Sequence, residues 1–193
     1  KDYDDLRIIV YSVVKKTDLK KSPDLIELSL GKHLHEKLEF VKHHFNKEIN
    51  VREAFEKLQL VDVRGLTKGK GLQGAVRRFG IALKQHKSEK GVRRAGSLGP
   101  WHPARVTFRT PQAEQLGMFT RVTYNNKIIE VNNISEKNIN LASGFNNFGN
   151  IKTDYIIVYG SVQGPSKRPL ILTHPIRPTK KQSKKNYELI ELR

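Results

Sequence analysis

A glycine pattern that could bind phosphate lies in the middle of the chain, where GxGxxG is spelled by Gly69, Gly71 and Gly74. In dinucleotide-binding folds these glycines bring the backbone to a pyrophosphate at the start of a long helix. The residues that follow here read AVRRFG and end at Gly80, so the helix is too short, and Glu89 lies among lysines instead of after a second strand. We therefore expect the glycines to let the backbone approach a phosphate chain while Lys68 and Lys70 neutralise its charge. A nucleotide-binding enzyme is the alternative.

Positive charge is concentrated around these glycines. Residues 64–121 contain thirteen lysines and arginines against two acidic residues, whereas residues 1–63 carry as many acidic as basic side chains. The whole chain has a net charge of +17, and the segment 64–121 has too few apolar positions to form a core of its own. Such a segment is typical of a chain that binds a polyanion. The spread of the charge favours structured nucleic acid over a small phosphorylated ligand.

The side chains that we expect to bind RNA phosphates lie mostly in this segment. They are Lys68, Lys70, Arg77, Arg78, Lys84, Lys87, Arg93, Arg94, Arg105, Arg109 and Arg121, together with Lys167 and Arg168 farther along the chain. Adjacent arginines in a glycine-rich loop are suited to bidentate phosphate contacts. The alternative for the arginine pairs is a plain solvated surface.

The single tryptophan of the chain stands in the sequence Gly99-Pro100-Trp101-His102-Pro103. Two prolines restrict the backbone on either side, so the segment should form a stiff tip that presents an indole and an imidazole. The nearby side chains are arginines rather than leucine or valine. This favours stacking of Trp101 on an unpaired base or packing against an RNA backbone, with Gly99 allowing close approach. A core aromatic at a turn is the alternative.

Four histidines cluster on one predicted helix: His33, His35, His43 and His44. The stretch HEKLE resembles the zinc motif HExxH, but Glu39 occupies the place of the second histidine. The spacings do not bring the four side chains to one helical face, so we expect a solvated surface, with metal binding as the alternative. No serine stands in a nucleophile elbow, and no pair of carboxylates falls in a plausible cleft. We therefore expect no bound metal, no cofactor and no catalytic site.

The chain contains no cysteine, which excludes disulfides, zinc fingers and thiol catalysis and favours a reducing, cytoplasmic setting. No apolar run approaches the roughly 18 residues that span a bilayer, and the start does not resemble a signal peptide, so we expect no membrane partner. The first residue is Lys1, which suggests a processing boundary or the edge of a split gene.

The apolar periodicity predicts short strands with a few helical segments between them. Strands are expected at residues 6–14 (a buried strand), 25–30, 60–66, 106–108, 122–131, 151–162 and 170–172, with a hairpin turn at Asn125-Asn126.

Helical segments are expected between the first strands. A helix over residues 32–45 should carry one apolar stripe, formed by Leu34, Leu38, Val41 and Phe45. A helical turn over residues 51–58 should begin at Asn50, with Glu53 completing a capping box. Residues 175–185 are rich in proline and lysine and should be extended or disordered.

These elements indicate a mainly β fold with α elements, in the α+β class: a small antiparallel barrel with a helical insertion and a long basic, glycine-rich extension. A sandwich is the alternative arrangement. The expected organisation is a strand-and-helix appendage over residues 1–60, barrel strands over 61–178 that are interrupted by the extension at about 67–121, and a basic carboxy-terminal tail over 179–193.

Several segments together closely resemble the archaeal and eukaryotic branch of the ribosomal protein L-three family. They are TKGKGLQGAVRRFG, RRAGSLGPWHPARV, TPQAEQLG, YNNKIIEV and SGFNNFGNIKTDYIIVYGSVQGPSKRPLILTHPIRP. The resemblance covers roughly residues 60–178, and the preceding helix and INVREAF fit more loosely. Agreement over so many parts is more specific than any single motif.

The resemblance implies a translation-protein-like barrel and no enzymatic activity. In the family, the central extension leaves the barrel and runs into large-subunit rRNA toward the peptidyl transferase centre. A tryptophan at its tip corresponds to Trp101, followed by His102 and Pro103. The implied role is structural: support of subunit assembly in cytoplasmic ribosomes, with large-subunit rRNA and neighbouring large-subunit proteins as partners. The alternative is a free-standing RNA-binding protein or RNA chaperone that uses the same basic loop.

The chain departs from the family pattern at two places. Glu114 stands where the family has glycine, and Met118-Phe119 stands where it has a Tyr-His pair. A carboxylate that faces RNA phosphates is unfavourable, so we expect the turn at Glu114 to lie away from RNA or to bind a cation. The family also has an amino-terminal basic arm and first barrel strands, which nothing before Lys1 supplies. Either a separate chain provides them, or the barrel is incomplete and its strand edges favour aggregation.

Overall fold

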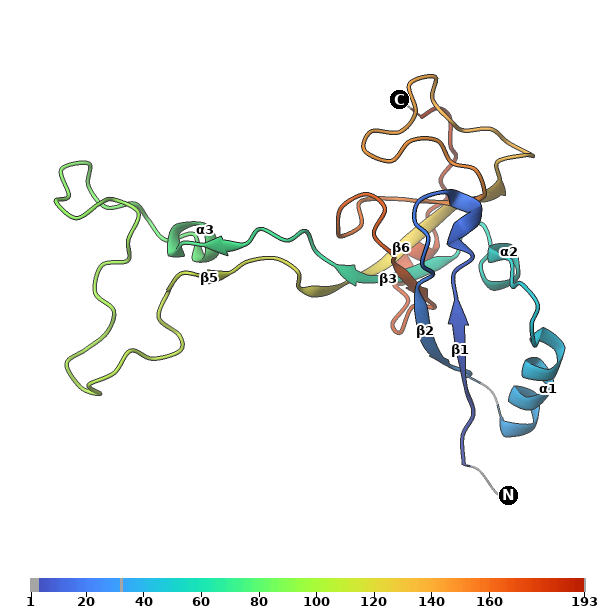
Figure 1. Ribbon diagram of the computed structural model, residues 1–193, viewed down its shortest axis with the longest axis horizontal. Helices are drawn as coiled ribbons and strands as arrows, with labels where there is room; N and C mark the ends of the chain where they lie inside the picture. Colours follow the sequence, from blue (N-terminus) through green and yellow to red (C-terminus); the bar gives the residue numbers. More distant parts are fainter. Residues whose placement is uncertain (1–3, 32, 193) are drawn as a thin grey trace. The chain divides into compact units, whose positions relative to one another are not determined.

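The chain divides into two units in the computed structural model, which describes residues 4–31 and 33–192 (Figure 1). Unit 1 consists of Lys1–Val63, Val122–Val162 and Ser166–Arg193, and unit 2 consists of Arg64–Arg121 and Gln163–Pro165. The expected α+β class is confirmed, since short helices alternate with strands that pair mostly antiparallel. No helix in the described part of the chain is long and apolar enough to cross a membrane.

The first strands of unit 1 form a two-stranded ribbon of their own. β1 (Arg7–Tyr11) pairs antiparallel with β2 (Leu25–Ser29), and the 3-10 helix η1 (Val14–Thr17) follows β1. Alternate residues face opposite sides, so Ile8 and Val10 are half-buried whereas Ile9 and Tyr11 are exposed. Both predicted strands are confirmed. The expected burial of the strand at residues 6–14 is wrong, because this ribbon covers only one of its faces.

The predicted helix over residues 32–45 is confirmed as α1 (Leu34–His44). Leu34, Leu38 and Val41 of its apolar stripe are half-buried. Phe45 is exposed because it is the C-cap and has left the helical conformation, which carries its side chain off the stripe.

The next helical segment is α2 (Val51–Ala54), a single turn that is shorter than the predicted one. Its amino-terminal cap differs from the expected capping box. The Asn50 side chain makes no capping hydrogen bond, and its amide instead donates to Oε1 of Glu53 at 3.4 Å. The backbone supplies the first contact of the turn, because the N–H of Glu53 donates to Asn50 O at 3.1 Å.

A four-stranded sheet with the order β7-β6-β3-β8 forms the core of unit 1. Its strands are β3 (Leu60–Leu66), β6 (Thr120–Asn133), β7 (Asp154–Val158) and β8 (Ile171–Thr173). The fully buried centre consists of Val61, Val63 and Ile128, and the side chains that pack on it are Phe55, Val131, Ile156, Val158, Leu170 and Leu172. β-branched residues suit such a pleated surface, which is why these segments form strands.

This sheet is open in the described residues, so the structure there contains no closed barrel. β6 pairs antiparallel with β7, from Ile128↔Val158 to Asn133↔Asp154, with an irregularity between Ile128 and Glu130. β7 and β8 are the two edges of the sheet. Edge strands can accept a further strand from another chain.

A buried carboxylate explains why the chain does not turn back at Asn125-Asn126. The predicted hairpin turn is wrong, since β6 continues through both residues. Asn125 does adopt the left-handed φ of +57° that a turn requires. Its N–H, however, donates to Oδ1 of Asp62 at 2.9 Å. Asp62 is fully buried, and a buried carboxylate must be hydrogen-bonded; its Oδ2 accepts from the N–H of Ile176 at 3.2 Å.

The carboxy-terminal segment is ordered around a buried lysine. The expectation that residues 175–185 are extended or disordered is wrong for residues 180–183, which form the one-turn helix α4 (Lys180–Ser183). The Lys127 side chain is only 2% exposed, and its Nζ donates to the carbonyls of Gln182 at 3.2 Å, Ser183 at 2.8 Å and Lys185. An ammonium group carries three donors, and all three are satisfied here.

Two further contacts hold the same segment within unit 1. The N–H of Thr179 donates to Oδ1 of Asn125 at 3.3 Å. The ring of Tyr187 stacks on Tyr159 with centroids 4.3 Å apart, and the loss of solvent around its hydroxyl raises the pKa of Tyr187.

Lys127→Met should release the carboxy-terminal segment. The substitution keeps the length of the side chain but leaves three carbonyl groups without their donor, at a cost of about 1 to 3 kcal/mol. We expect trypsin to cleave after Lys184 and Lys185 faster than in the wild type. The control is Lys137→Met, which removes the same charge from a half-exposed side chain that pairs with Glu130. Equal cleavage rates in the two variants would contradict the role of Lys127.

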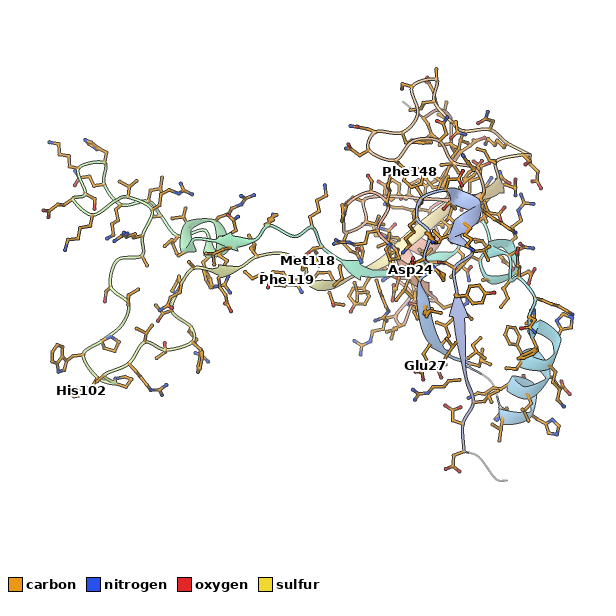
Figure 2. All side chains as sticks on the ribbon, viewed as in Figure 1. Asp24, Glu27, His102, Met118, Phe119 and Phe148 are labelled. Carbon is orange, nitrogen blue, oxygen red and sulfur yellow. The ribbon has the colours of Figure 1, made fainter. Side chains whose placement is uncertain are left out.

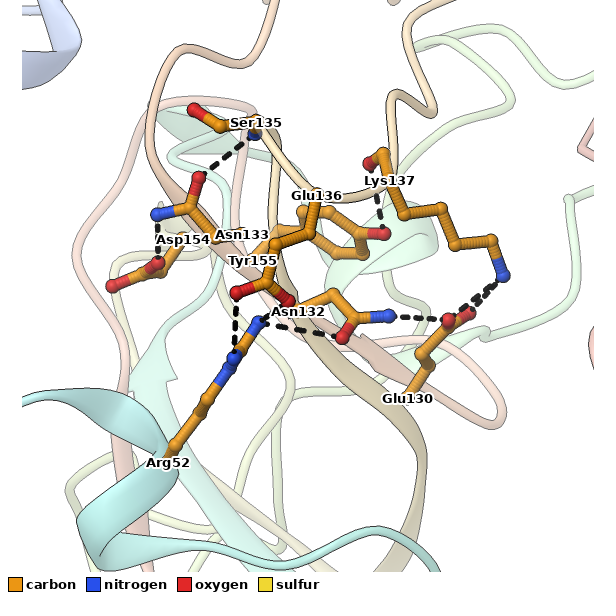
Figure 3. Close-up of polar contacts among 9 residues, drawn as sticks. All are labelled: Arg52, Glu130, Asn132, Asn133, Ser135, Glu136, Lys137, Asp154 and Tyr155. Carbon is orange, nitrogen blue, oxygen red and sulfur yellow. Dashed lines mark hydrogen bonds and ion pairs between the residues drawn. The ribbon is translucent and has the colours of Figure 1, made fainter.

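A polar cluster fixes the end of β6 and the turn that follows it (Figure 3). Arg52 of α2 forms a bidentate ion pair with Glu136, in which Nη1 donates to Oε1 at 2.9 Å. Within the same turn, Nζ of Lys137 lies 2.7 Å from Oε1 of Glu130. The hydroxyl of Tyr155 donates to the carbonyl of Lys137 at 3.2 Å.

The ion pair between Arg52 and Glu136 should make stability depend on acid pH. The hydrogen bond from Arg52 lowers the pKa of Glu136 below its ordinary value of 4.5. The unfolded chain therefore binds this proton more readily than the folded one. The ion pair therefore stabilises the folded chain above about pH 4.5, and this stabilisation is lost as the pH falls through the lowered pKa of Glu136.

Acid unfolding of two variants checks this expectation. Glu136→Gln should flatten the stability profile below about pH 4.5, whereas Glu188→Gln at an exposed position of the tail should leave it unchanged. Identical profiles of stability against pH for both variants would show that the ion pair between Arg52 and Glu136 does not stabilise the folded chain.

Candidate nucleic-acid interface

Unit 2 begins as a two-stranded ribbon. β4 (Leu72–Gln73) pairs antiparallel with β5 (Glu114–Gln115). Backbone hydrogen bonds continue the pairing toward β3 and β6: Lys70 N–H to Leu116 O at 2.9 Å, Leu116 N–H to Gly71 O at 2.9 Å, and Thr67 N–H to Phe119 O at 3.0 Å. We call residues 67–73 and 114–119 the ribbon. It carries the exposed side chains of Lys68 and Lys70.

One glycine of the ribbon, Gly117, is required by the chain's own packing, and a second, Gly69, lies close to a neighbouring side chain. A Cβ at Gly117 would lie 2.0 Å from Lys68 O, and the φ of Gly117 is +85°. A Cβ at Gly69 would lie 3.2 Å from Cγ of Met118. Figure 2 shows Met118 beside Phe119 on this part of the ribbon. Nothing in the sequence marks Gly117 as required, apart from the presence of a glycine after a short polar strand.

The other predicted glycines border open space. A Cβ at Gly71, Gly74 or Gly99 would meet nothing within 4 Å, as close approach of a ligand requires. Gly71 has a φ of +63°, which favours glycine, whereas the φ of Gly74 is an ordinary −72°. The conformation of Gly74 therefore gives no reason for a glycine at that position.

The helix after these glycines is short, as the sequence predicts. α3 (Ala75–Phe79) ends at Gly80, whose φ is +69°. Five residues make less than two turns, so the helix that a dinucleotide site needs is not formed. Its first residue, Ala75, is buried, and Arg77 is exposed.

An intramolecular ion pair accounts for Glu114. Its Oε2 lies 2.5 Å from Nη2 of Arg78, whose Nη1 donates to Gln112 O at 3.0 Å. The guanidinium also lies over the ring of Phe79, 4.9 Å from its centroid. The cation that we expect at Glu114 is therefore supplied by the chain itself. Arg78 has this role in addition to the phosphate contact that the sequence predicts.

Between the two arms of the ribbon the chain forms a long irregular loop. Every residue from 80 to 113 is described, and none belongs to a helix or strand, so the predicted strand at residues 106–108 is wrong. The apolar residues there have no neighbouring strand to pair with, and Val106 is exposed. We call residues 80–111 the basic loop. A few backbone contacts hold it, such as Lys84 N–H to Val92 O at 3.0 Å.

The basic loop presents its charges and aromatic rings to solvent. Its predicted RNA-binding side chains are all exposed: Lys84, Lys87, Arg93, Arg94, Trp101, His102, Arg105 and Arg109. Trp101 is 88% exposed, so the alternative of a core aromatic is wrong. Figure 2 shows the His102 side chain on this loop.

Three predicted basic residues lie outside the basic loop, the ribbon and α3. Arg121 is exposed, and its guanidinium lies 5.1 Å from the centroid of the Phe119 ring within unit 2. Lys167 and Arg168 belong to unit 1, where Lys167 is exposed and Arg168 is half-buried. The predicted set is thus divided between the units.

The histidines of α1 make local contacts. Nδ1 of His44 lies 3.0 Å from Phe40 O, and the two rings are 4.2 Å apart. Within residues 4–31 and 33–192, no three histidine or acidic side chains are placed so that they could hold a metal ion.

Comparison with known proteins identifies the family of the chain. The family model described as Ribosomal protein L3 matches residues 1–193. Among curated relatives, the large ribosomal subunit protein uL3 of Methanocaldococcus jannaschii is 39% identical over 179 residues, which cover 91% of this chain and 53% of the relative. That of Nanoarchaeum equitans is 38% identical over 182 residues, covering 94% and 56%. That of Archaeoglobus fulgidus is 40% identical over 163 residues, covering 83% and 49%. The chain spans about half the length of these relatives. With a match along its whole length, the chain belongs to the ribosomal protein L3 family.

Proposed function

We propose that this chain is a non-enzymatic, structural constituent of the large ribosomal subunit and that unit 2 binds large-subunit rRNA. The observation that carries the proposal is the basic loop: residues 64–121 hold thirteen basic residues against two acidic ones, and residues 80–113 contain no helix or strand. Such a loop needs a fixed partner of opposite charge to hold one conformation. The name of the relatives, large ribosomal subunit protein uL3, supports rRNA as that partner.

The parts of unit 2 suit different tasks in this role. Backbone hydrogen bonds fix the ribbon, so its lysines can meet phosphates at set positions. Each lysine or arginine that neutralises a phosphate releases counterions and adds affinity. Glu114 does not oppose this, because Arg78 neutralises it. The exposed Trp101 and His102 serve as the tip that reaches toward the peptidyl transferase centre, and the loop supports subunit assembly by fixing rRNA segments around it.

The remaining parts of the proposal concern organisation and partners. Residues 1–60 form an appendage, residues 61–178 form the barrel body that the extension interrupts, and residues 179–193 form a tail. Lys167 and Arg168 add a phosphate contact from unit 1. Neighbouring large-subunit proteins are further partners. A separate polypeptide that adds strands at the sheet edges β7 and β8 would complete the barrel.

Crosslinking in the native cells tests the proposal. The tagged chain is crosslinked to RNA, and the attached RNA is sequenced. We expect reads concentrated on large-subunit rRNA around the peptidyl transferase centre, with the protein sites in residues 93–105. Reads scattered over messenger and transfer RNA would favour the alternative, a free-standing RNA-binding protein or RNA chaperone. Salt separates the two as well: a free-standing binder should dissociate steeply between about 50 and 200 mM, whereas an embedded component resists washing at several-fold higher salt.

Gly74→Ala tests close approach of the backbone to phosphate. Alanine fits the φ of −72° and meets nothing within 4 Å, so the chain should stay folded with only the small loss of stability that alanine causes at a helix N-cap. If a phosphate lies against this glycine, affinity for rRNA should drop about 10-fold or more, because the new methyl group displaces it. Unchanged affinity would remove Gly74 from the interface. The matched control is Gly96→Ala, which also meets nothing within 4 Å.

A further inference from the structure

The basic loop carries a second aromatic side chain that is wholly exposed. Phe108 has a relative exposure of 104%, the highest among the large apolar side chains of the described residues. It follows Arg105 and directly precedes Arg109, both exposed. Leaving a phenylalanine in water forgoes about 1.5 to 3 kcal/mol of burial, so its position calls for a partner.

Hydrogen bonds on both sides hold Phe108 at the tip of a turn. The N–H of Thr110 donates to Thr107 O at 3.2 Å, which places Phe108 and Arg109 at the two central positions. The Thr110 hydroxyl donates to Leu98 O at 3.0 Å and lies 3.4 Å from the Thr107 hydroxyl. A hydroxyl carries one proton, so Thr107 must be the donor to Thr110. The turn is thereby tied to residue 98 across the loop.

We propose that Phe108 stacks on an unpaired nucleobase of the RNA that unit 2 binds, as a second aromatic contact in addition to Trp101. This inference rests on the proposed function and specifies which part of the RNA the loop reads. Bases in loops and bulges are unstacked and present a free face, which an aromatic side chain can cover. Because the turn is held in advance, little conformational entropy is lost when the base binds.

The charges around the turn favour a nucleobase over a pocket on another protein. Arg109 shares the turn with Phe108, so any partner that covers the ring must also accept a guanidinium group. A protein pocket would need acidic side chains beside an apolar floor. An RNA loop supplies both at once, since each base is joined to a phosphate that an arginine can bind. Trp101 is another exposed aromatic side chain of the same loop.

Binding of the full chain to deproteinised large-subunit rRNA from the source cells tests the inference. Phe108→Ala should weaken binding about 5- to 150-fold, the range found for loss of one base stack. The slope of affinity against salt should stay the same, because no charge is lost. Phe108→Trp should bind like the wild type, and Phe108→Leu should be as weak as Phe108→Ala. Val106→Ala is the control for a neighbouring exposed apolar side chain. All these side chains are exposed, so the variants should fold.

The outcomes separate this inference from the proposed function. If the wild type binds the rRNA no better than an unrelated RNA, both fail. If it binds specifically but Phe108→Ala is unchanged, or Phe108→Leu is as tight as the wild type, stacking is refuted and rRNA binding stands. A photoreactive benzoylphenylalanine placed at position 108 in cells gives a second readout. Capture of RNA supports the stack, and capture of protein alone overturns it.

Discussion

Gly117→Ala is expected to disrupt the ribbon of unit 2. The new Cβ would lie 2.0 Å from Lys68 O and 3.0 Å from Cα of Gly69, and backbone atoms cannot rotate away as a side chain can. The φ of +85° adds strain of about 1 to 3 kcal/mol for a residue other than glycine. The backbone must therefore shift, and the hydrogen bonds beside it should break. By hydrogen exchange, the amides of Lys70 and Leu116 should exchange at least about 100-fold faster than in the wild type.

Loss of the ribbon should also weaken RNA binding, because the lysines of the ribbon lose their fixed positions. Gly96→Ala is the control, since its Cβ meets nothing within 4 Å and its backbone does not require glycine. Unchanged protection of the two amides in Gly117→Ala would mean that the strands of the ribbon are not paired as described.

Reversal of charge at Arg93 and Arg94 should have the largest effect on RNA binding. Both side chains are exposed on the basic loop and suited to bidentate phosphate contacts. Two charge-assisted hydrogen-bonding sites become two repelling carboxylates, so the affinity for large-subunit rRNA should fall at least about 100-fold. The slope of log affinity against log salt should become shallower by about 2. In cells, the double variant should accumulate unassembled near the top of a sucrose gradient, with little of it in the large-subunit fraction.

A matched pair of substitutions separates position from net charge. Lys20→Glu with Lys21→Glu changes the total charge equally but lies in the electrically balanced part of the sequence, where both side chains are exposed. This control variant should retain nearly all of the affinity for rRNA.

Trp101→Ala should enter subunits almost normally and instead perturb tRNA accommodation or drug response near the active centre. If Trp101→Ala and the arginine double variant behave alike in assembly and in translation, then the arginines do not act mainly through affinity and Trp101 does not act mainly through positioning.

The local sequence pattern was sufficient to predict those helices and strands that are stabilised mainly by residues near them in the sequence. The apolar stripe of α1 and the β-branched runs of β3 and β7 are found close to their expected places. The end of α3 at Gly80 follows from the glycine itself. The exposure of Trp101 follows from neighbours that are arginines and prolines. In each case the residues within one or two turns decide the outcome.

The errors lie where a distant partner overrides the local pattern. Asn125-Asn126 has the composition of a hairpin, but Asp62 takes the N–H that would point into the turn. Lys127, with its ammonium on three carbonyls, orders a tail that looks disordered by composition. Residues 106–108 look like a strand but have no strand to pair with. The exposure of Phe108 could not be predicted from the sequence. Its neighbours do not indicate that the turn keeps this side chain out of a hydrophobic core.

The buried charges of unit 1 have a consequence for the order in which the protein matures on the ribosome that makes it. Asp62 and Lys127 emerge from the exit tunnel well before Ile176 and residues 182–185, which are their partners. An ion withdrawn from water without a partner is costly, so the sheet cannot close firmly around either side chain until these partner residues have emerged. The body of unit 1 therefore consolidates only after residues 182–185 have emerged. By then the whole basic loop has been outside and within reach of RNA, so capture of RNA by the loop can precede consolidation of the core.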